Sequence, residues 1–131
     1  MDSHQQHALR RFGQACQRLQ ELVSVPDNRI VRDALIKRFE FSFEAGRNAA
    51  YCWIRARGIA VSERSDAVIL QALKLQLVTD ELGWGEICRY RDRADHADDD
   101  AVADEVAAFA RGPGQALLAE LLQALQAHSD D

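Results

Sequence analysis

Residues 36–44 read Ile36-Lys37-Arg38-Phe39-Glu40-Phe41-Ser42-Phe43-Glu44, with phenylalanine at three alternate positions. This run lies inside a proline-free stretch, residues 29–57, whose apolar side chains recur at helical spacing and which is followed by Gly58. The pattern predicts one long helix that ends at the glycine, a residue favoured just beyond a helix C-terminus. In such a helix Phe41 points about 160–200° away from the phenylalanines on either side. We therefore expect this helix to bury two faces, as an inner bundle helix or a dimer-interface helix does.

The rest of the chain shows the same helical periodicity and no alternating β-branched run. Further helices are expected at residues 4–24, 65–78 and 81–94, and after Asp98-Asp99-Asp100 with a kink or break at Gly112-Pro113-Gly114. The expected N-cap residues are Asp27 or Asn28, Ser62 and Ser65, Asp80, and the aspartate run. The apolar stripe of the long helix is expected to comprise Ile30, Leu35, Phe39, Phe43, Ala50 and Ile54. We predict an all-α fold, an antiparallel up-and-down bundle of four or five helices in one domain of residues 1–131, with residues 1–7 and 127–131 frayed.

The composition is ordinary for a globular domain, because 47% of the 131 residues are hydrophobic and 28% are charged. No run approaches the roughly 20 apolar residues that span a bilayer, and the polar N-terminus lacks the apolar core of a signal peptide. We therefore expect a cytoplasmic protein without a membrane partner. Cys16, Cys52 and Cys88 fall at apolar helix positions without metal-ligand spacing, so we expect buried reduced thiols and no metal site. The sequence has no phosphate-binding loop, dinucleotide fingerprint, nucleophile elbow or Cys-x-x-Cys motif, so we expect no cofactor.

The formal net charge of −5 is unevenly distributed along the chain. Residues 1–65 contain 11 Lys and Arg against 7 Asp and Glu, whereas residues 66–131 contain 5 against 14. The acidic second half argues against broad nucleic-acid binding and against a DNA partner, but it leaves room for a local basic groove. The asymmetry suits a self-complementary dimer or a basic partner, and solvated helix faces explain it equally well.

The long helix is itself rich in basic side chains, and two interpretations of them stay open. The helix presents a broad cationic surface to phosphate groups or an acidic partner, or it has a solvated face interleaved with Glu40 and Glu44. The basic residues are Arg29, Arg32, Lys37, Arg38, Arg47, Arg55 and Arg57.

Arg91 and His96 have the side chains best suited to chemistry on a phosphodiester. An arginine holds a phosphate through paired N–H donors, and a histidine that titrates near neutrality moves a proton to or from a ribose hydroxyl. Five helical positions separate the two side chains by about 140°, so they converge only if the helix unwinds near Asp95. The alternative is an ion pair between Arg91 and Asp95 on the helix surface, with a solvated His96. The neighbouring aspartates are expected to cap a helix rather than to bind Mg²⁺, since no turn motif gathers them around an ion.

Two of these segments resemble the signatures of one protein family. The run of residues 36–44 resembles the RFEFTFELAWK signature of nucleotidyltransferase substrate-binding proteins. Trp84, followed by Arg91 and His96, resembles the W…RNxxSHTY segment of the same family. The order of elements agrees over roughly residues 8–125.

The resemblance implies a HEPN-type helical bundle, usually a homodimer, that is encoded beside a separate small nucleotidyltransferase and binds it. Relatives in the wider HEPN group include ribonuclease toxins whose neighbouring nucleotidyltransferase serves as antitoxin. This chain departs from the motif at Asp92, which replaces an asparagine, repels phosphate and cannot donate a hydrogen bond when ionised. Asp98 replaces the motif's tyrosine, so a tyrosine-directed nucleotidyl modification is not expected there. The signature's Trp and Lys are Arg47 and Asn48 here.

The residues and the resemblance support two hypotheses from different functional classes. The first is a homodimeric partner, or substrate-binding, subunit that docks a small nucleotidyltransferase near Arg91 and His96, with nucleotide or RNA left open as a further ligand. The alternative is a metal-independent ribonuclease of the toxin type, with His96 as catalytic acid or base and Arg91 as phosphate clamp. The acidic second half and Asp92 favour binding over cleavage. The predicted binding residues are Phe39, Phe41, Phe43, Glu44, Trp84, Arg91, Asp92 and His96.

Overall fold

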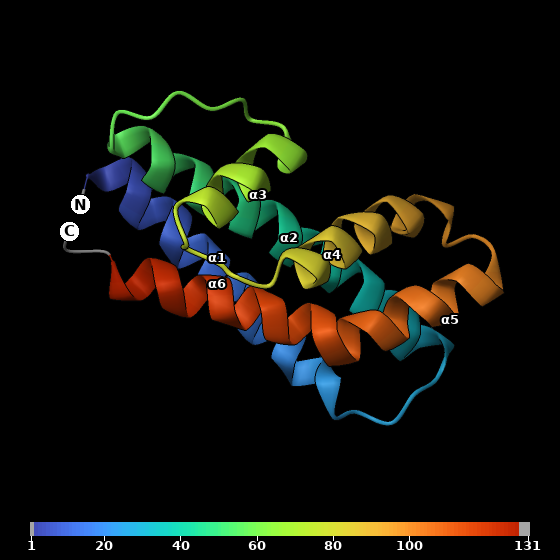
Figure 1. Cartoon of the computed structure of the whole chain (residues 1–131). Helices are drawn as coiled ribbons and strands as arrows, with labels where there is room; N and C mark the ends of the chain where they lie inside the picture. Colours follow the sequence, from blue (N-terminus) through green and yellow to red (C-terminus); the bar gives the residue numbers. More distant parts are fainter. Residues whose placement is uncertain (1, 129–131) are drawn as a thin grey trace.

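The computed structural model of the chain describes residues 2–128, and all regular structure in that range is helical (Figure 1). The elements are α1 (Ser3–Val23), α2 (Arg29–Ala56), α3 (Ser65–Lys74), α4 (Glu81–Arg93), η1 (Ala94–His96), α5 (Asp100–Phe109), η2 (Ala110–Gly114) and α6 (Gln115–Ala127). The prediction of an all-α bundle is confirmed, and the helices predicted at 4–24, 29–57 and 81–94 agree with the structure to within one residue at each end. Within the described range, no helix is long and apolar enough to cross a membrane.

The inner helix of the bundle is α2. It packs against α1 along its length and also contacts α3, α5 and α6, while α6 lies along α1 (Figure 1). Gly46 allows the close approach of α1, because a Cβ added there would lie 2.9 Å from ring atoms of Phe12. Arg32 ties α2 to α5 through carboxylate oxygens of Asp100 and Asp104, each 3.1 Å from its guanidinium.

The outer face of α2 corrects one expectation from the sequence. Phe41 is 59% exposed and Ile30 is 82% exposed, so α2 buries one broad face within this chain rather than two. The neighbouring helices cover the side of α2 that presents Phe39 and Phe43, which are 0% and 2% exposed. Phe41 projects from the opposite side, which α1 and α4 flank without covering.

Side-chain caps fix most helix starts where the sequence predicts them. Oxygens of Asn28, Asp80 and Asp99 accept backbone N–H hydrogen bonds of 2.9, 2.8 and 2.9 Å at the starts of α2, α4 and α5. The prediction for α3 is wrong, because Arg64 occupies the N-cap position without a side-chain cap. Ser62 instead accepts a hydrogen bond from the backbone of Arg64 within the preceding turn.

The ends of α3 and α1 also differ from expectation. α3 ends at Lys74 rather than near residue 78, because the backbone of Gln76 adopts a positive φ of 58° and turns Leu77 and Val78 into the core. α1 begins at Ser3, so residues 3–7 are helical where fraying was expected. The cap is Asp2, whose carboxylate accepts a hydrogen bond of 2.8 Å from the backbone of Gln5. Met1 and residues 129–131 lie outside the described residues.

The predicted kink near residue 112 is confirmed. α5 and α6 meet through the five-residue turn η2, where Gly112 has the non-helical angles φ −104° and ψ −108° and is followed by Pro113. Proline removes one helical hydrogen bond and clashes with the preceding turn, so the axis bends there. The bend lets α5 cover one end of α2 while α6 continues along α1 (Figure 1).

Candidate functional site

The residues predicted to bind a partner divide into a buried set and an exposed set. Phe39, Phe43 and Trp84 are core side chains, each no more than 2% exposed. The indole nitrogen of Trp84 is buried without a hydrogen-bond partner within residues 2–128. Phe41 and Glu44 are exposed on the outer face of α2, so they are the signature residues that a partner can reach.

Arg91 reaches from α4 toward the outer face of α2 and is surrounded by carboxylates. Its guanidinium lies 3.2 Å from Asp95, 3.7 Å from Glu40 and 3.9 Å from Glu44. The ion pair with Asp95 is the structural alternative that the sequence left open for this arginine. Three carboxylates compete with any incoming phosphate, so Arg91 is not poised as an anion clamp.

His96 lies beyond the end of α4, in a short turn of 3₁₀-helix that spans Ala94–His96. The helix therefore unwinds near Asp95, as convergence with Arg91 would require. His96 is nevertheless solvent-exposed and forms no hydrogen bond or ion pair with Arg91. A hollow of about 350 Å³ beside Arg91 does not include His96 and is lined by Phe43, Arg64, Ser65, Asp66, Cys88, Arg91 and Asp92.

The pKa of the Cys88 thiol indicates how this hollow affects a negative charge. Burial, followed by the nearby carboxylates of Asp92 and Asp66, raises the pKa of the Cys88 thiol to about 11. A strongly cationic site would stabilise the thiolate and lower this pKa. The hollow is therefore not an activated thiol site.

The surface around Arg91 is acidic as a whole. We call Glu40, Glu44, Arg91, Asp92 and Asp95 the carboxylate face, since three carboxylates lie within 4 Å of the Arg91 guanidinium and Asp92 lines the hollow beside it. The described residues contain no group of three His, Cys, Asp or Glu side chains that could hold a metal ion. Of the aspartates that follow His96, Asp99 caps α5 and Asp100 binds Arg32.

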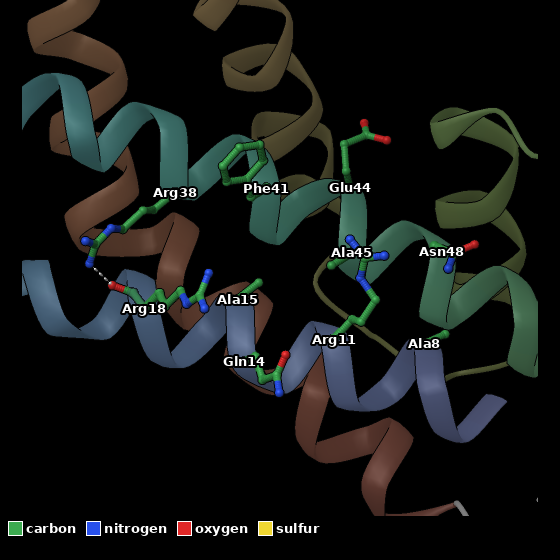
Figure 2. Close-up of a pocket in the computed structure, with 10 residues that line it drawn as sticks. All are labelled: Ala8, Arg11, Gln14, Ala15, Arg18, Arg38, Phe41, Glu44, Ala45 and Asn48. Carbon is green, nitrogen blue, oxygen red and sulfur yellow. Dashed lines mark hydrogen bonds between the residues drawn. The ribbon is translucent and has the colours of Figure 1, made fainter. Parts of the chain in front are cut away.

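A second site lies on the other side of the outer face of α2, between α1 and α2 (Figure 2). It is a groove of about 460 Å³ with small side chains on its floor and arginines around it. We call it the arginine groove, and it is lined by Ala8, Arg11, Gln14, Ala15, Arg18, Arg38, Phe41, Glu44, Ala45 and Asn48.

Antiparallel packing of α1 on α2 sets the register of the arginine groove. Arg38 donates a hydrogen bond of 2.7 Å to the backbone carbonyl of Arg18, and the hydroxyl of Ser42 donates one of 3.1 Å to the carbonyl of Ala15. Arg18 and Arg38 therefore lie at one end of the groove, while Arg11 lies about two turns along α1. Figure 2 shows Phe41 between these two ends.

This groove was not predicted from the sequence. The basic side chains noted there belong to α2, whereas Arg11 and Arg18 of the groove belong to α1. Arg11 and Arg18 are seven positions apart, and seven residues return a helix to nearly the same face. That spacing was the available signal, although only the packing of α1 on α2 places Phe41 opposite it.

Comparisons with known proteins agree with the fold. A sequence model of the family described as "Nucleotidyltransferase substrate binding protein like" matches residues 3–127. The chain is also similar to a protein from Thermus thermophilus of known crystal structure, with a TM-score of 0.80 and 25% sequence identity. That similarity covers 88% of this chain and 98% of the other. A comparison with curated proteins finds no match.

Proposed function

The chain belongs to the nucleotidyltransferase substrate-binding-protein-like family, and we propose that it is the cytoplasmic, helical partner subunit of a small, separately encoded nucleotidyltransferase. The family match over residues 3–127 is the main support for this proposal. The partner enzyme supplies the nucleotidyl-transfer chemistry. This chain supplies a docking surface and holds what the enzyme acts on.

We assign the docking surface to the carboxylate face. Glu44 and Asp95 have side chains that are 48% and 65% exposed, and Asp92 is exposed beside them. The four carboxylates outnumber the guanidinium groups of Arg91 and Arg47 that pair with them, and this excess of negative charge complements a basic surface on a partner. Electrostatic complementarity of this kind speeds association and sets the orientation of the two proteins.

Co-purification tests the docking proposal. The tagged chain is expressed together with the small nucleotidyltransferase encoded beside it, and the mass of the eluted species is measured by light scattering. We expect a stable complex, which Asp92→Arg weakens by reversing one exposed charge at the C-terminal end of α4. Glu120→Arg is the matched control, because Glu120 is an exposed acid on α6 with no partner in the described range. Absence of a wild-type complex, or equal loss with both variants, contradicts the proposal.

The geometry favours this role over the ribonuclease alternative. A clamp-and-base mechanism needs Arg91 and His96 to converge on one phosphodiester, yet Arg91 is paired with carboxylates and His96 is exposed without an ion pair or hydrogen bond to it. We expect no cleavage of bulk tRNA in EDTA beyond background, and no difference between wild type and His96→Ala. Metal-free cleavage that His96→Ala abolishes would establish the ribonuclease function instead.

The proposal includes a homodimer. Its support is the family resemblance, together with two exposed leucines on neighbouring helices, Leu70 of α3 and Leu82 of α4, which are 54% and 85% exposed. Their burial between two copies would remove apolar surface from water. Light scattering at micromolar concentration should give the mass of a dimer for the wild type, and Leu82→Glu should shift it toward the monomer. A monomer mass for the wild type removes the dimer from the proposal.

A further inference from the structure

The arginine groove contains cationic side chains that the fold itself does not use. Arg11 and Arg18 are exposed, and neither guanidinium has a hydrogen-bond or ion-pair partner within residues 2–128. Most other arginines in that range are paired, such as Arg47 with Glu44 and Arg89 with Glu86. Two unpaired guanidinium groups that line one groove are therefore available to bind an anion.

The acidic residue of the groove does not neutralise these arginines. Glu44 binds Arg47 at 3.3 Å and lies 3.9 Å from Arg91, so its carboxylate is already engaged. Figure 2 shows the Glu44 side chain pointing away from α1, whereas Arg11 and Arg18 rise from α1. The third arginine, Arg38, lies near Arg18 but is already engaged, because it donates a hydrogen bond to the Arg18 backbone carbonyl and forms an ion pair of 3.4 Å with Glu21. The interior of the groove is thus positively charged.

Phe41 adds a planar apolar surface to this cationic groove. Its ring is 59% exposed although it belongs to a helix whose other phenylalanines are fully buried. Lys37 lies 5.3 Å from the ring centroid and brings a further positive charge to the same position. A nucleobase stacks well on such a ring, and base–aromatic stacking tolerates any base. The amides of Gln14 and Asn48 border the groove as neutral hydrogen-bonding groups.

The dimensions of the groove suit one nucleotide. Its volume of about 460 Å³ lies within the range of about 300–1,000 Å³ typical of small-molecule sites. Arg11 and Arg18 are about 10 Å apart along α1, so both side chains can reach one triphosphate chain. A second copy of this chain is a poor occupant, because a two-fold axis through the groove would bring like charges together.

From these features we infer that the arginine groove binds a nucleoside triphosphate, with its phosphates between Arg11 and Arg18 and its base stacked on Phe41. This inference rests on the proposed function and deepens it, because the bound nucleotide lies beside the carboxylate face. The outer face of α2 then lies between a nucleotide bound on the α1 side and an enzyme docked on the α4 side.

Calorimetric titration of ATP into the purified chain tests the inference. Arg11→Gln and Arg18→Gln should each weaken binding by about tenfold, because each removes charge-assisted hydrogen bonds to phosphate. Phe41→Ala should weaken it by at least about fivefold through loss of stacking. Arg10→Gln and Arg55→Gln are matched controls, since both arginines are exposed and unpaired in the described range but lie outside the groove. Each control should change affinity by less than about twofold.

Parallel titrations identify the ligand class. Adenosine and inorganic tripolyphosphate should each bind more weakly than ATP. Adenosine lacks the phosphates that the arginines bind, and tripolyphosphate lacks the base that stacks on Phe41. Equal affinity for tripolyphosphate and ATP, together with no effect of Phe41→Ala, would show a simple anion patch and overturn the inference. Tighter binding of a single-stranded oligoadenylate than of ATP would identify an RNA surface instead. Absence of ATP binding at millimolar concentration overturns the inference outright.

Failure of this inference is distinguishable from failure of the proposed function. The same variants are assayed for complex formation with the nucleotidyltransferase, where Arg18→Gln should behave as wild type. A complex without nucleotide binding overturns only the groove assignment. Arginine-dependent ATP binding without a complex overturns only the partner-subunit function.

Discussion

Arg91, on the α4 side of α2, lies 3.2, 3.7 and 3.9 Å from the carboxylates of Asp95, Glu40 and Glu44. On the α1 side, Arg11 and Arg18 have no such partner in the described part of the chain. The two regions lie on either side of the outer face of α2, and both contain arginine. Only the region on the α1 side contains guanidinium groups that are not already paired with carboxylates. The presence of an arginine therefore does not identify a phosphate site, since the charges already paired with it decide what it can bind.

The largest expected difference in stability is between Phe39 and Phe41, two phenylalanines on opposite sides of α2. Phe39→Ala should lower the free energy of unfolding by about 3–5 kcal/mol, because a fully buried ring leaves a cavity in the core. Phe41→Ala should change it by about 0.5 kcal/mol or less, because the ring is largely exposed. Denaturant unfolding of both variants measures the two changes in the free energy of unfolding. Equal losses would mean that Phe41 is buried in solution, which would remove the stacking surface of the arginine groove.

The floor of the arginine groove depends on the close packing of α1 on α2. Gly46→Ala should destabilise the chain by about 1–3 kcal/mol, because the added methyl group meets the ring of Phe12 at 2.9 Å. Gly85→Ala is the matched change on α4, where nothing lies within 4 Å of the added Cβ. It should stabilise the chain by about 0.5–1 kcal/mol through helix propensity. Thermal unfolding tests whether Gly46→Ala lowers and Gly85→Ala raises the stability. An unchanged stability for Gly46→Ala would indicate that α1 and α2 pack loosely beneath the groove.

The arginines themselves should differ in their contribution to stability. Arg91→Ala should cost about 1 kcal/mol, because it leaves Glu40, Glu44 and Asp95 to repel one another without a counter-charge. Arg18→Ala should be neutral within about 0.5 kcal/mol, because its side chain has no partner to lose. Urea unfolding at low and high salt distinguishes them, since only the Arg91 effect should shrink as salt increases. A similar cost for both arginines would contradict the difference between the regions.

The smallest expected effect is a change in thiol ionisation on the α4 side. Asp92→Asn should lower the pKa of Cys88 from about 11, because it removes one of the carboxylates that raise it, although burial remains the larger cause. Ultraviolet thiolate absorbance measures this in a background where Cys16 and Cys52 are replaced by alanine. The ordinary thiol value is 9.0, so the stabilising contribution of the protonated Cys88 is complete below pH 9 and is lost as pH rises toward about 11. An unchanged pKa would mean that Asp92 does not act on this thiol.

The sequence predicts the framework of the fold well, because strong local signals determine it. Asn28 and Asp80 start helices through side-chain caps, and the glycine–proline turn near residue 112 bends the last helix as expected. The early end of α3 was not predictable, because a positive φ at Gln76 is favoured by no feature of that residue type. It results from burying Leu77 and Val78 in the core.

The site was less predictable because it depends on which charges meet across helices. The sequence identified Phe41, Glu44 and Arg91 as binding candidates but could not show that Glu40 and Glu44 neutralise Arg91. It also gave Phe41 a buried role, since periodicity reports the angle of a side chain and not whether another helix covers it. Pairing between distant helices follows only from the packed fold.

On this account the enzyme docks on the α4 side of α2 and the nucleotide binds on the α1 side. The most direct test of this arrangement is the affinity of the purified nucleotidyltransferase for wild type, Asp92→Arg and Arg18→Gln, measured by calorimetry. We predict that Asp92→Arg weakens binding at least about tenfold, while Arg18→Gln stays within about twofold of wild type. Loss of binding with Arg18→Gln and full binding with Asp92→Arg would contradict this account, because the arginine groove would then be the docking surface.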